Sequence, residues 1–144
     1  MLTVDLDKLA LAPGTVCVDV GCGEGRHTLA TYLIDGVQAL GIDLSERDLG
    51  TATQRIQDMT PHAPGGDIGF AAGDATGLPL SDDSVDAVIA SEILEHIPNY
   101  LAVLEELGRV LKAGGRWCIR VPRPWPAWVW GQRREGERPR HDPA

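Results

Sequence analysis

The stretch Val16–Gly25, VCVDVGCGEG, joins a short apolar run to one acid, Asp19, and to glycines at every second position, Gly21, Gly23 and Gly25. Glycine lacks the Cβ that would keep a ligand away from the backbone, so this pattern after a buried strand is typical of a ligand-binding loop. A carboxylate just before the loop can hold an ammonium group, directly or through water. An ordinary strand-to-helix turn is the alternative interpretation.

Two further acids stand where later apolar runs end. Asp43 lies 22 residues after Gly21, close to the roughly 20 residues at which a carboxylate meets ribose hydroxyls. Asp74 follows the next run, where a carboxylate can accept from an adenine amino group while the N–H of Ala75 donates to the ring. Asp43 could instead favour a helix N-terminus, although Ser45 is better placed to cap that helix. Together with the glycine loop, these acids predict a nucleoside site.

The glycine spacing separates two kinds of nucleoside ligand. A dinucleotide loop reads G-x-G-x-x-G and would need its third glycine at position 26, but that residue is Arg26 and the glycine is Gly25. A pyrophosphate would also be repelled by Asp19. The pattern therefore favours an adenosine that carries an amino acid and no phosphate, and it disfavours a nucleotide-dependent oxidoreductase.

Strands and helices that alternate along the chain must position these residues. Continuous apolar runs, as in strands buried on both faces of a parallel sheet, occur at 16–20, 37–42, 68–72, 85–90 and 117–121. Helical patterns lie between them, at about 25–35, from Ser45 to Pro61, and from Asn99 to a glycine C-cap at Gly114-Gly115. Right-handed crossovers between such elements give an open, doubly wound α/β sheet, mostly parallel and of about five strands.

Composition narrows the class of protein. The chain has 144 residues, the length of one domain, and no apolar run approaches the roughly 20 residues of a membrane helix. Residues 1–121 carry eighteen acidic against eight basic side chains, which argues against nucleic acid as a partner. Its three cysteines have neither disulfide-framework nor zinc-site spacing, and the amino terminus lacks the pattern of a secretory signal. We therefore expect a cytoplasmic protein, without a metal, that acts on a small molecule.

The stretch from about residue 13 to residue 122 resembles the class I S-adenosylmethionine-dependent methyltransferases, in particular the small-molecule group that includes enzymes of ubiquinone and menaquinone biosynthesis. This resemblance implies a Rossmann-like fold, methylation of a small-molecule acceptor and S-adenosyl-L-methionine as the cofactor. The matching segments are VDVGCGEGRHT (18–28), GIDLS (41–45), GDATGLPLSDDSVDAVIASEILEHI (73–97) and LEELGRVLKAGGRW (104–117).

The same resemblance assigns roles to individual positions around the cofactor. The implied contacts are Asp19, Gly21, Cys22, Gly23 and Gly25 at the methionine portion, Asp43 at the ribose hydroxyls, Leu44 against the adenine face, Asp74 and Ala75 at the adenine edge, and Ser91 and Glu92 closing the pocket near the methionine.

Methyl transfer from a sulfonium chiefly requires an aligned acceptor, and a base helps when the acceptor is a hydroxyl or an acidic carbon. His96 lies in the Glu-His pair that such enzymes often place beside the reacting centre, and an imidazole titrates near neutrality. We take His96 as the first candidate for a catalytic base, with Glu92 and Glu95 as weaker candidates. A structural or substrate-shaping role for His96 is the alternative.

The sequence departs from this family near its carboxyl end. Proteins of the family that the chain resembles have a seven-stranded sheet, but only 23 residues follow Val121. We therefore expect the last two strands to be missing. We predict a cofactor-binding domain at 1–121 and a Pro/Trp/Arg-rich tail at 122–144. The fifth strand would then have a bare edge, open to a protein partner or to self-association unless Trp125, Trp128 and Trp130 cover it. A truncated, noncatalytic cofactor-binding module or partner subunit is therefore the alternative function.

Overall fold

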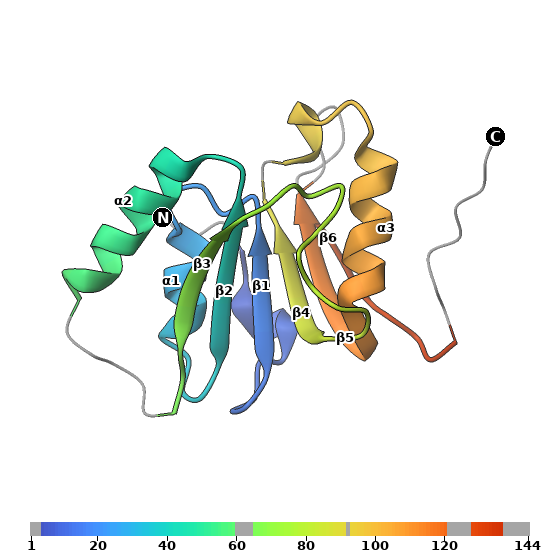
Figure 1. Cartoon of the computed structure of the whole chain (residues 1–144). Coiled ribbons are helices and arrows are strands. Elements are labelled where there is room, and N and C mark those ends of the chain that lie inside the picture. Colours follow the sequence, from blue (N-terminus) through green and yellow to red (C-terminus); the bar gives the residue numbers. More distant parts are fainter. Residues whose placement is uncertain (1–3, 60–64, 92, 121–127, 137–144) are drawn as a thin grey trace.

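The structure, a computed structural model, describes residues 4–59, 65–91, 93–120 and 128–136, and these form one six-stranded sheet with helices on both faces (Figure 1). The strand order is β3-β2-β1-β4-β5-β6, and all neighbours are parallel except β5 and β6. The expected doubly wound, mostly parallel α/β fold is confirmed. In chain order the elements are η1 (Leu6–Leu9), β1 (Val16–Val20), α1 (Arg26–Tyr32), β2 (Gln38–Asp43), α2 (Glu46–Gln57), β3 (Ile68–Ala72), β4 (Val85–Ala90), η2 (Leu94–His96), α3 (Tyr100–Val110), β5 (Leu111–Arg120) and β6 (Trp128–Gln132).

The strand order reverses between β1 and β4. The chain moves outward from β1 through β2 to β3 and then returns to place β4 on the other side of β1. Asp19 of β1 is thus paired with Gly41 of β2 and with Ile89 of β4. Ligands of open α/β sheets bind at such a reversal, beyond the carboxyl ends of the strands. The fold therefore places the acidic strand β1 at the position where a site is expected.

Alternate residues of the central strand enter two separate cores. Val18 and Val20 pack in one core with Val103 and Leu107 of α3. Cys17 points the other way, into a second core that includes Leu9 of η1. This alternation follows from the two-residue period of a strand, which sends successive side chains to opposite faces of the sheet. The continuous apolar runs of the sequence reflect burial on both faces.

Capping residues explain where two of the helices begin. Ser45 accepts from the N–H of Asp48 at 3.2 Å, as expected for the start of α2, and Asn99 accepts from Ala102 at 3.4 Å at the start of α3. The predicted end of α3 at Gly114-Gly115 is wrong, because the helix ends at Val110 and β5 follows at once. Gly114, with φ of 82°, instead lies within β5, and its N–H donates to the carbonyl of Arg133.

The edge of β5 is paired, contrary to the prediction of a bare edge. β6 runs antiparallel along it, with Trp117 opposite Gly131 and Cys118 opposite Trp130. A Cβ at Gly131 would overlap the Trp117 ring, so glycine lets the indole lie across the two strands. Trp130 adds to the second core and lies under Lys8, whose Nζ is 5.3 Å from the ring centroid. The expected cover thus comes from a sixth strand within 122–144; Trp125 lies outside the described residues.

Candidate functional site

The glycine loop joins β1 to α1 at the carboxyl end of the central strand. Gly21, Gly23 and Gly25 all have positive φ, at 72°, 54° and 83°. A Cβ at Gly21 would come within 2.9 Å of Ile93 Cδ1, and one at Gly25 within 2.9 Å of Phe70 Cζ. A Cβ at Gly23 would meet nothing within 4 Å. Packing therefore requires the outer two glycines, whereas Gly23 leaves open space in front of the loop.

The Asp43 carboxylate holds the glycine loop against the start of α2. Oδ2 accepts from the N–H of Gly23 at 2.9 Å and Oδ1 accepts from the N–H of Ser45 at 2.8 Å. The carbonyl of Ile42 accepts from Gly21 and Cys22 at 2.7 and 3.0 Å. Each carboxylate oxygen has two acceptor sites, so Asp43 retains one on each oxygen for a pair of hydroxyls.

Asp19 is a buried acid with an unsatisfied oxygen. Its side chain is 2 % exposed, and Oδ2 accepts from Thr28 Oγ1 at 2.8 Å. Among the described residues nothing donates to Oδ1, which is also buried. Burial, with a smaller contribution from the nearby Asp43 carboxylate, raises the pKa of Asp19 to about 7 against the lowering effect of the hydrogen bonds from Thr28. A buried acceptor without a donor costs roughly 1–3 kcal/mol, which a cationic donor on a ligand would offset.

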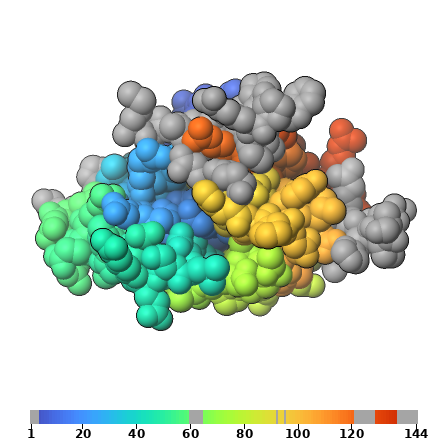
Figure 2. Space-filling view, turned by 90° about the horizontal axis from the view of Figure 1, so that it is seen from above, coloured from blue at the N-terminus to red at the C-terminus, as the bar shows by residue number. Residues whose placement is uncertain are grey.

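A cavity of about 270 Å³ opens in front of these residues. Figure 2 looks onto this side of the molecule, where the surfaces of the β1–α1 loop, the β2–α2 junction and the η2 segment meet. The volume lies near the lower end of the roughly 300–1,000 Å³ of small-molecule sites. The lining comes from four segments: Val20 and Gly21; Ile42, Asp43 and Leu44; Gly73 and Ala75; and Ile93, His96 and Ile97.

The structure brings about half of the predicted site residues to this cavity. Gly21, Asp43, Leu44, Ala75 and His96 line it, and Leu44 is 69 % exposed, which leaves an apolar face available to a ring. The other predicted residues that the structure describes do not line the cavity, namely Asp19, Cys22, Gly23, Gly25, Asp74 and Ser91. Glu92 lies outside the described residues.

Two of the predicted residues interact mainly with their own loops. Asp74 is exposed, and its Oδ1 accepts from the N–H of Thr76 at 2.9 Å and from Thr76 Oγ1 at 2.8 Å, which lowers its pKa. Cys22 is buried, its Sγ lies 3.6 Å from the carbonyl of Gly23, and burial raises its pKa to about 12. Cys22 is therefore a small packing residue rather than a reactive thiol.

Sequence analysis missed Ile93 and Ile97, which close the cavity from either end of η2. The one sequence signal for them was that two isoleucines lie within four residues of each other around His96. Within the parts of the chain that the structure describes, no group of three or more His, Cys, Asp or Glu side chains could hold a metal ion. No helix among those same residues is both long enough and apolar enough to span a bilayer.

Residues 18–119 match the family described as "Methyltransferase domain". The chain belongs to this methyltransferase family. The match contains the glycine loop, all four cavity-lining segments and α3, and it confirms the resemblance to class I S-adenosylmethionine-dependent methyltransferases.

Three similar proteins illustrate the match. Demethylmenaquinone methyltransferase of Staphylococcus aureus is 34% identical over 122 residues, 83% of this chain and 48% of the relative. A chain of the complex between the Haloferax volcanii methyltransferase activator Trm112 and a candidate methyltransferase is 30% identical, with a TM-score of 0.67 over 79% of this chain and 48% of that one. Phosphoethanolamine N-methyltransferase 2 of Haemonchus contortus, solved with S-adenosyl-L-methionine, is 25% identical, with a TM-score of 0.70 over 79% and 26%.

The chain spans about half the length of the curated methyltransferase that it matches. The comparisons support S-adenosyl-L-methionine as the cofactor of this family and the Rossmann-like sheet as its fold. They cover the part of the molecule that contains the cavity.

Proposed function

We propose that this chain binds S-adenosyl-L-methionine and transfers its methyl group to a small-molecule acceptor. The observation that carries the proposal is Asp19, a buried carboxylate just before the glycine loop. One of its oxygens has no hydrogen-bond donor in the part of the chain that the structure describes. A buried, unpaired carboxylate is costly unless a cation meets it, and the methionine portion of the cofactor carries an ammonium group. A phosphate-bearing ligand would bring a second negative charge to the same place.

The neighbouring residues suit the rest of such a cofactor. Asp43 keeps acceptor sites for the two ribose hydroxyls, and Leu44 offers an exposed apolar surface to the adenine face. Ala75 lines the same cavity and would meet the adenine edge, with Asp74 beside it in the chain. Gly21, Cys22, Gly23 and Gly25 would surround the methionine portion, which Ser91 and Glu92 would close off.

His96 is our candidate for the catalytic base. It lines the cavity from η2, and its backbone N–H donates to the carbonyl of Ile93, whose side chain packs against Gly21. The cofactor supplies an activated methyl group, so the protein has to orient the acceptor and, for a hydroxyl or an acidic carbon, to take its proton. A histidine at this position could take that proton from the acceptor.

The acceptor that we propose is a small molecule in the cytoplasm. The net charge of −8 disfavours nucleic acid, and the relatives reported above are named for demethylmenaquinone and phosphoethanolamine as substrates. A second candidate function is a cofactor-binding subunit that needs a protein partner for activity. It is favoured by the solved relative in complex with the activator Trm112.

Calorimetric titration tests the cofactor assignment. S-adenosylhomocysteine should bind the purified chain more tightly than adenosine, because only the former has the ammonium group, and NAD should bind weakly or not at all. Binding of NAD in preference to S-adenosylhomocysteine would refute the proposal.

Methyl release against a panel of small acceptors then separates the enzyme from the binding subunit. His96→Ala should reduce turnover and leave the affinity for S-adenosylhomocysteine nearly unchanged; equal turnover would remove the assignment of His96 as base. Absence of turnover in a chain that binds the cofactor would favour the second candidate function.

A further inference from the structure

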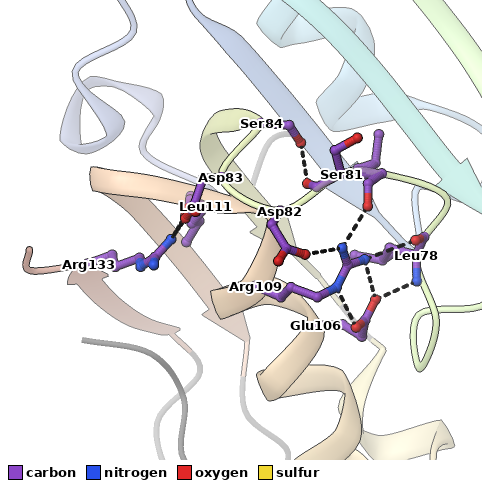
Figure 3. Close-up of polar contacts among 10 residues, drawn as sticks. Leu78, Ser81, Asp82, Asp83, Ser84, Glu106, Arg109, Leu111 and Arg133 are labelled. Carbon is purple, nitrogen blue, oxygen red and sulfur yellow. Dashed lines mark hydrogen bonds and ion pairs between the residues drawn. The ribbon is translucent and has the colours of Figure 1, made fainter. Parts of the chain in front are cut away.

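The loop that follows the cavity wall, residues 76–84, is held by one arginine of α3 (Figure 3). Arg109 uses all five of its guanidinium N–H donors. Its Nε and Nη2 form a fork with Glu106, at 2.7 Å to Oε1 and 2.8 Å to Oε2. Nη1 donates to the carbonyl of Leu80 at 2.8 Å and to Asp82 Oδ1 at 2.9 Å, and Nη2 donates to the carbonyl of Leu78 at 3.1 Å.

Glu106 completes this arrangement from the other side of Leu78. Its Oε2 accepts from the N–H of Leu78 at 2.7 Å, and Arg109 donates to the carbonyl of the same residue. Both backbone groups of Leu78 are therefore hydrogen-bonded, one to each side chain. The Arg109 hydrogen bond lowers the pKa of Glu106. The Glu106 side chain is 16 % exposed, so this is not an ordinary solvent-exposed ion pair of a helix surface. We call Glu106 and Arg109 the loop clamp.

Pro79 connects the loop clamp to the cavity. It lies between the two carbonyls that Arg109 binds, and it packs on Gly73 of the cavity wall. A Cβ at Gly73 would come within 3.0 Å of Pro79 Cδ and within 2.9 Å of Ile42 Cγ2. Gly73 in turn donates its N–H to the carbonyl of Asp43 at 3.1 Å. The position of Leu78–Leu80 therefore determines how closely the wall segment 73–75 lies against the end of β2.

We propose that Glu106 and Arg109 are positioning residues, which set the wall of the nucleoside pocket by fixing Leu78–Leu80 so that Pro79 supports Gly73. This inference rests on the proposed function, because it takes the cavity to be the nucleoside site. Neither residue lines the cavity, so they act on a ligand only through the loop. Lysine cannot replace Arg109, because an ammonium is a point donor without the planar fork that serves two carbonyls and two carboxylates at once.

A second arginine offers a matched control at the far end of the same loop. Arg133, which follows β6, donates from Nη1 to Asp83 Oδ1 and to the carbonyl of Leu111 (Figure 3). Its side chain is 11 % exposed, so its replacement should also destabilise the protein. These partners, Asp83 and Leu111, lie outside Leu78–Leu80, and we therefore expect the cavity wall to be unaffected.

The test compares Arg109→Gln, Arg109→Lys and Glu106→Gln with Arg133→Gln in two measurements. The first is the Kd for S-adenosylhomocysteine, and the second is hydrogen exchange of the Gly73 amide in the ligand-free protein. Thermal unfolding identifies any variant that does not fold. If one of the two Arg109 variants does not fold, the other is used in its place.

Both Arg109 variants should weaken binding by roughly 2- to 30-fold and accelerate exchange at Gly73, whereas Arg133→Gln should change neither. Glu106→Gln should have a smaller effect, because the amide oxygen can still accept from Leu78. Unchanged exchange at Gly73 in folded Arg109 variants would overturn the inference, as would acceleration of the same size in Arg133→Gln. If wild-type protein does not bind S-adenosylhomocysteine, the proposed function fails, and the exchange measurement still decides whether the clamp sets the wall.

Discussion

Asp19→Asn should stabilise the ligand-free protein at neutral and alkaline pH while it weakens cofactor binding. The carboxylate is buried, one of its oxygens has no donor among the described residues, and its pKa is raised to about 7. Ionised Asp19 is therefore unfavourable unless a cation lies against it. Asparagine has nearly the same shape and carries no charge, so the variant avoids this cost.

The size of the effect follows from the pKa difference. The unfolded chain releases the Asp19 proton near pH 3.8, whereas the folded protein keeps it until about pH 7. Between these values the unfolded state binds fewer protons, so the free energy of unfolding falls as pH rises and stays low above pH 7. About three pH units correspond to about 4 kcal/mol, of which more than half is lost between pH 5 and 7.

Chemical denaturation of wild type and Asp19→Asn from pH 5 to 8 measures this directly. The advantage of the variant should increase by about 2–3 kcal/mol across this range, because the wild type alone loses stability through Asp19. Asp86→Asn serves as the control, since Asp86 is a half-buried carboxylate that accepts from Val16 and does not line the cavity. Parallel pH profiles for wild type and Asp19→Asn would refute the reasoning.

Three further predictions concern the loop, the clamp and the last strand. Gly21→Ala should lower the free energy of unfolding by about 1–3 kcal/mol, because φ is positive and the new Cβ would press on Ile93. Gly23→Ala should lower it by about 1–2 kcal/mol and also block the cofactor. Thermal unfolding and titration with S-adenosylhomocysteine check both variants, and retained binding by Gly23→Ala would contradict this prediction. The hydrogen bond from Arg109 lowers the pKa of Glu106, so the carboxylate stabilises the folded protein above pH 4.5 and this contribution is lost as pH falls below it. The difference in stability between wild type and Glu106→Gln should therefore vanish at low pH, and a difference that stays constant down to pH 3 would argue otherwise. Gly131→Ala should detach β6 through its clash with Trp117, seen as faster exchange of the Arg133 amide, which donates to the carbonyl of Gly115. Unchanged protection of that amide would show that the ring simply moves aside.

Residue patterns were sufficient for the elements that surround the cavity. The runs at 16–20, 68–72 and 85–90 coincide with β1, β3 and β4, because strands buried on both faces need continuous apolar residues. The Ser45 cap was also predicted, since capping depends on a local side-chain bond. Glycines are less decisive: Gly114-Gly115 suit a helix end, yet here they lie in β5 and exchange backbone hydrogen bonds with Arg133.

Long-range contacts were beyond the sequence patterns. Glu106 and Arg109 stand three residues apart in a helix, which predicts an exposed ion pair. That spacing gives no sign that a loop 28 to 29 residues earlier binds both. The strand β6 was missed because a five-residue run containing glycine is weak as a strand, and its pairing depends on the Trp117 ring of β5. Asp74 was expected at an adenine edge, and its bonds to Thr76 were not foreseen; its role at a nucleoside stays a prediction.

β1 lies between β2 and β4, so during synthesis it cannot pair on both sides until β4 has been made. Val16 donates to the Asp86 carboxylate at 2.8 Å, and these partners are separated by 70 residues. At about 5–20 residues per second a ribosome needs roughly 4–14 seconds to deliver β4 after β1. During that interval Val18 and Val20 lack the strand and helix that bury them, so the nascent amino-terminal half exposes apolar surface.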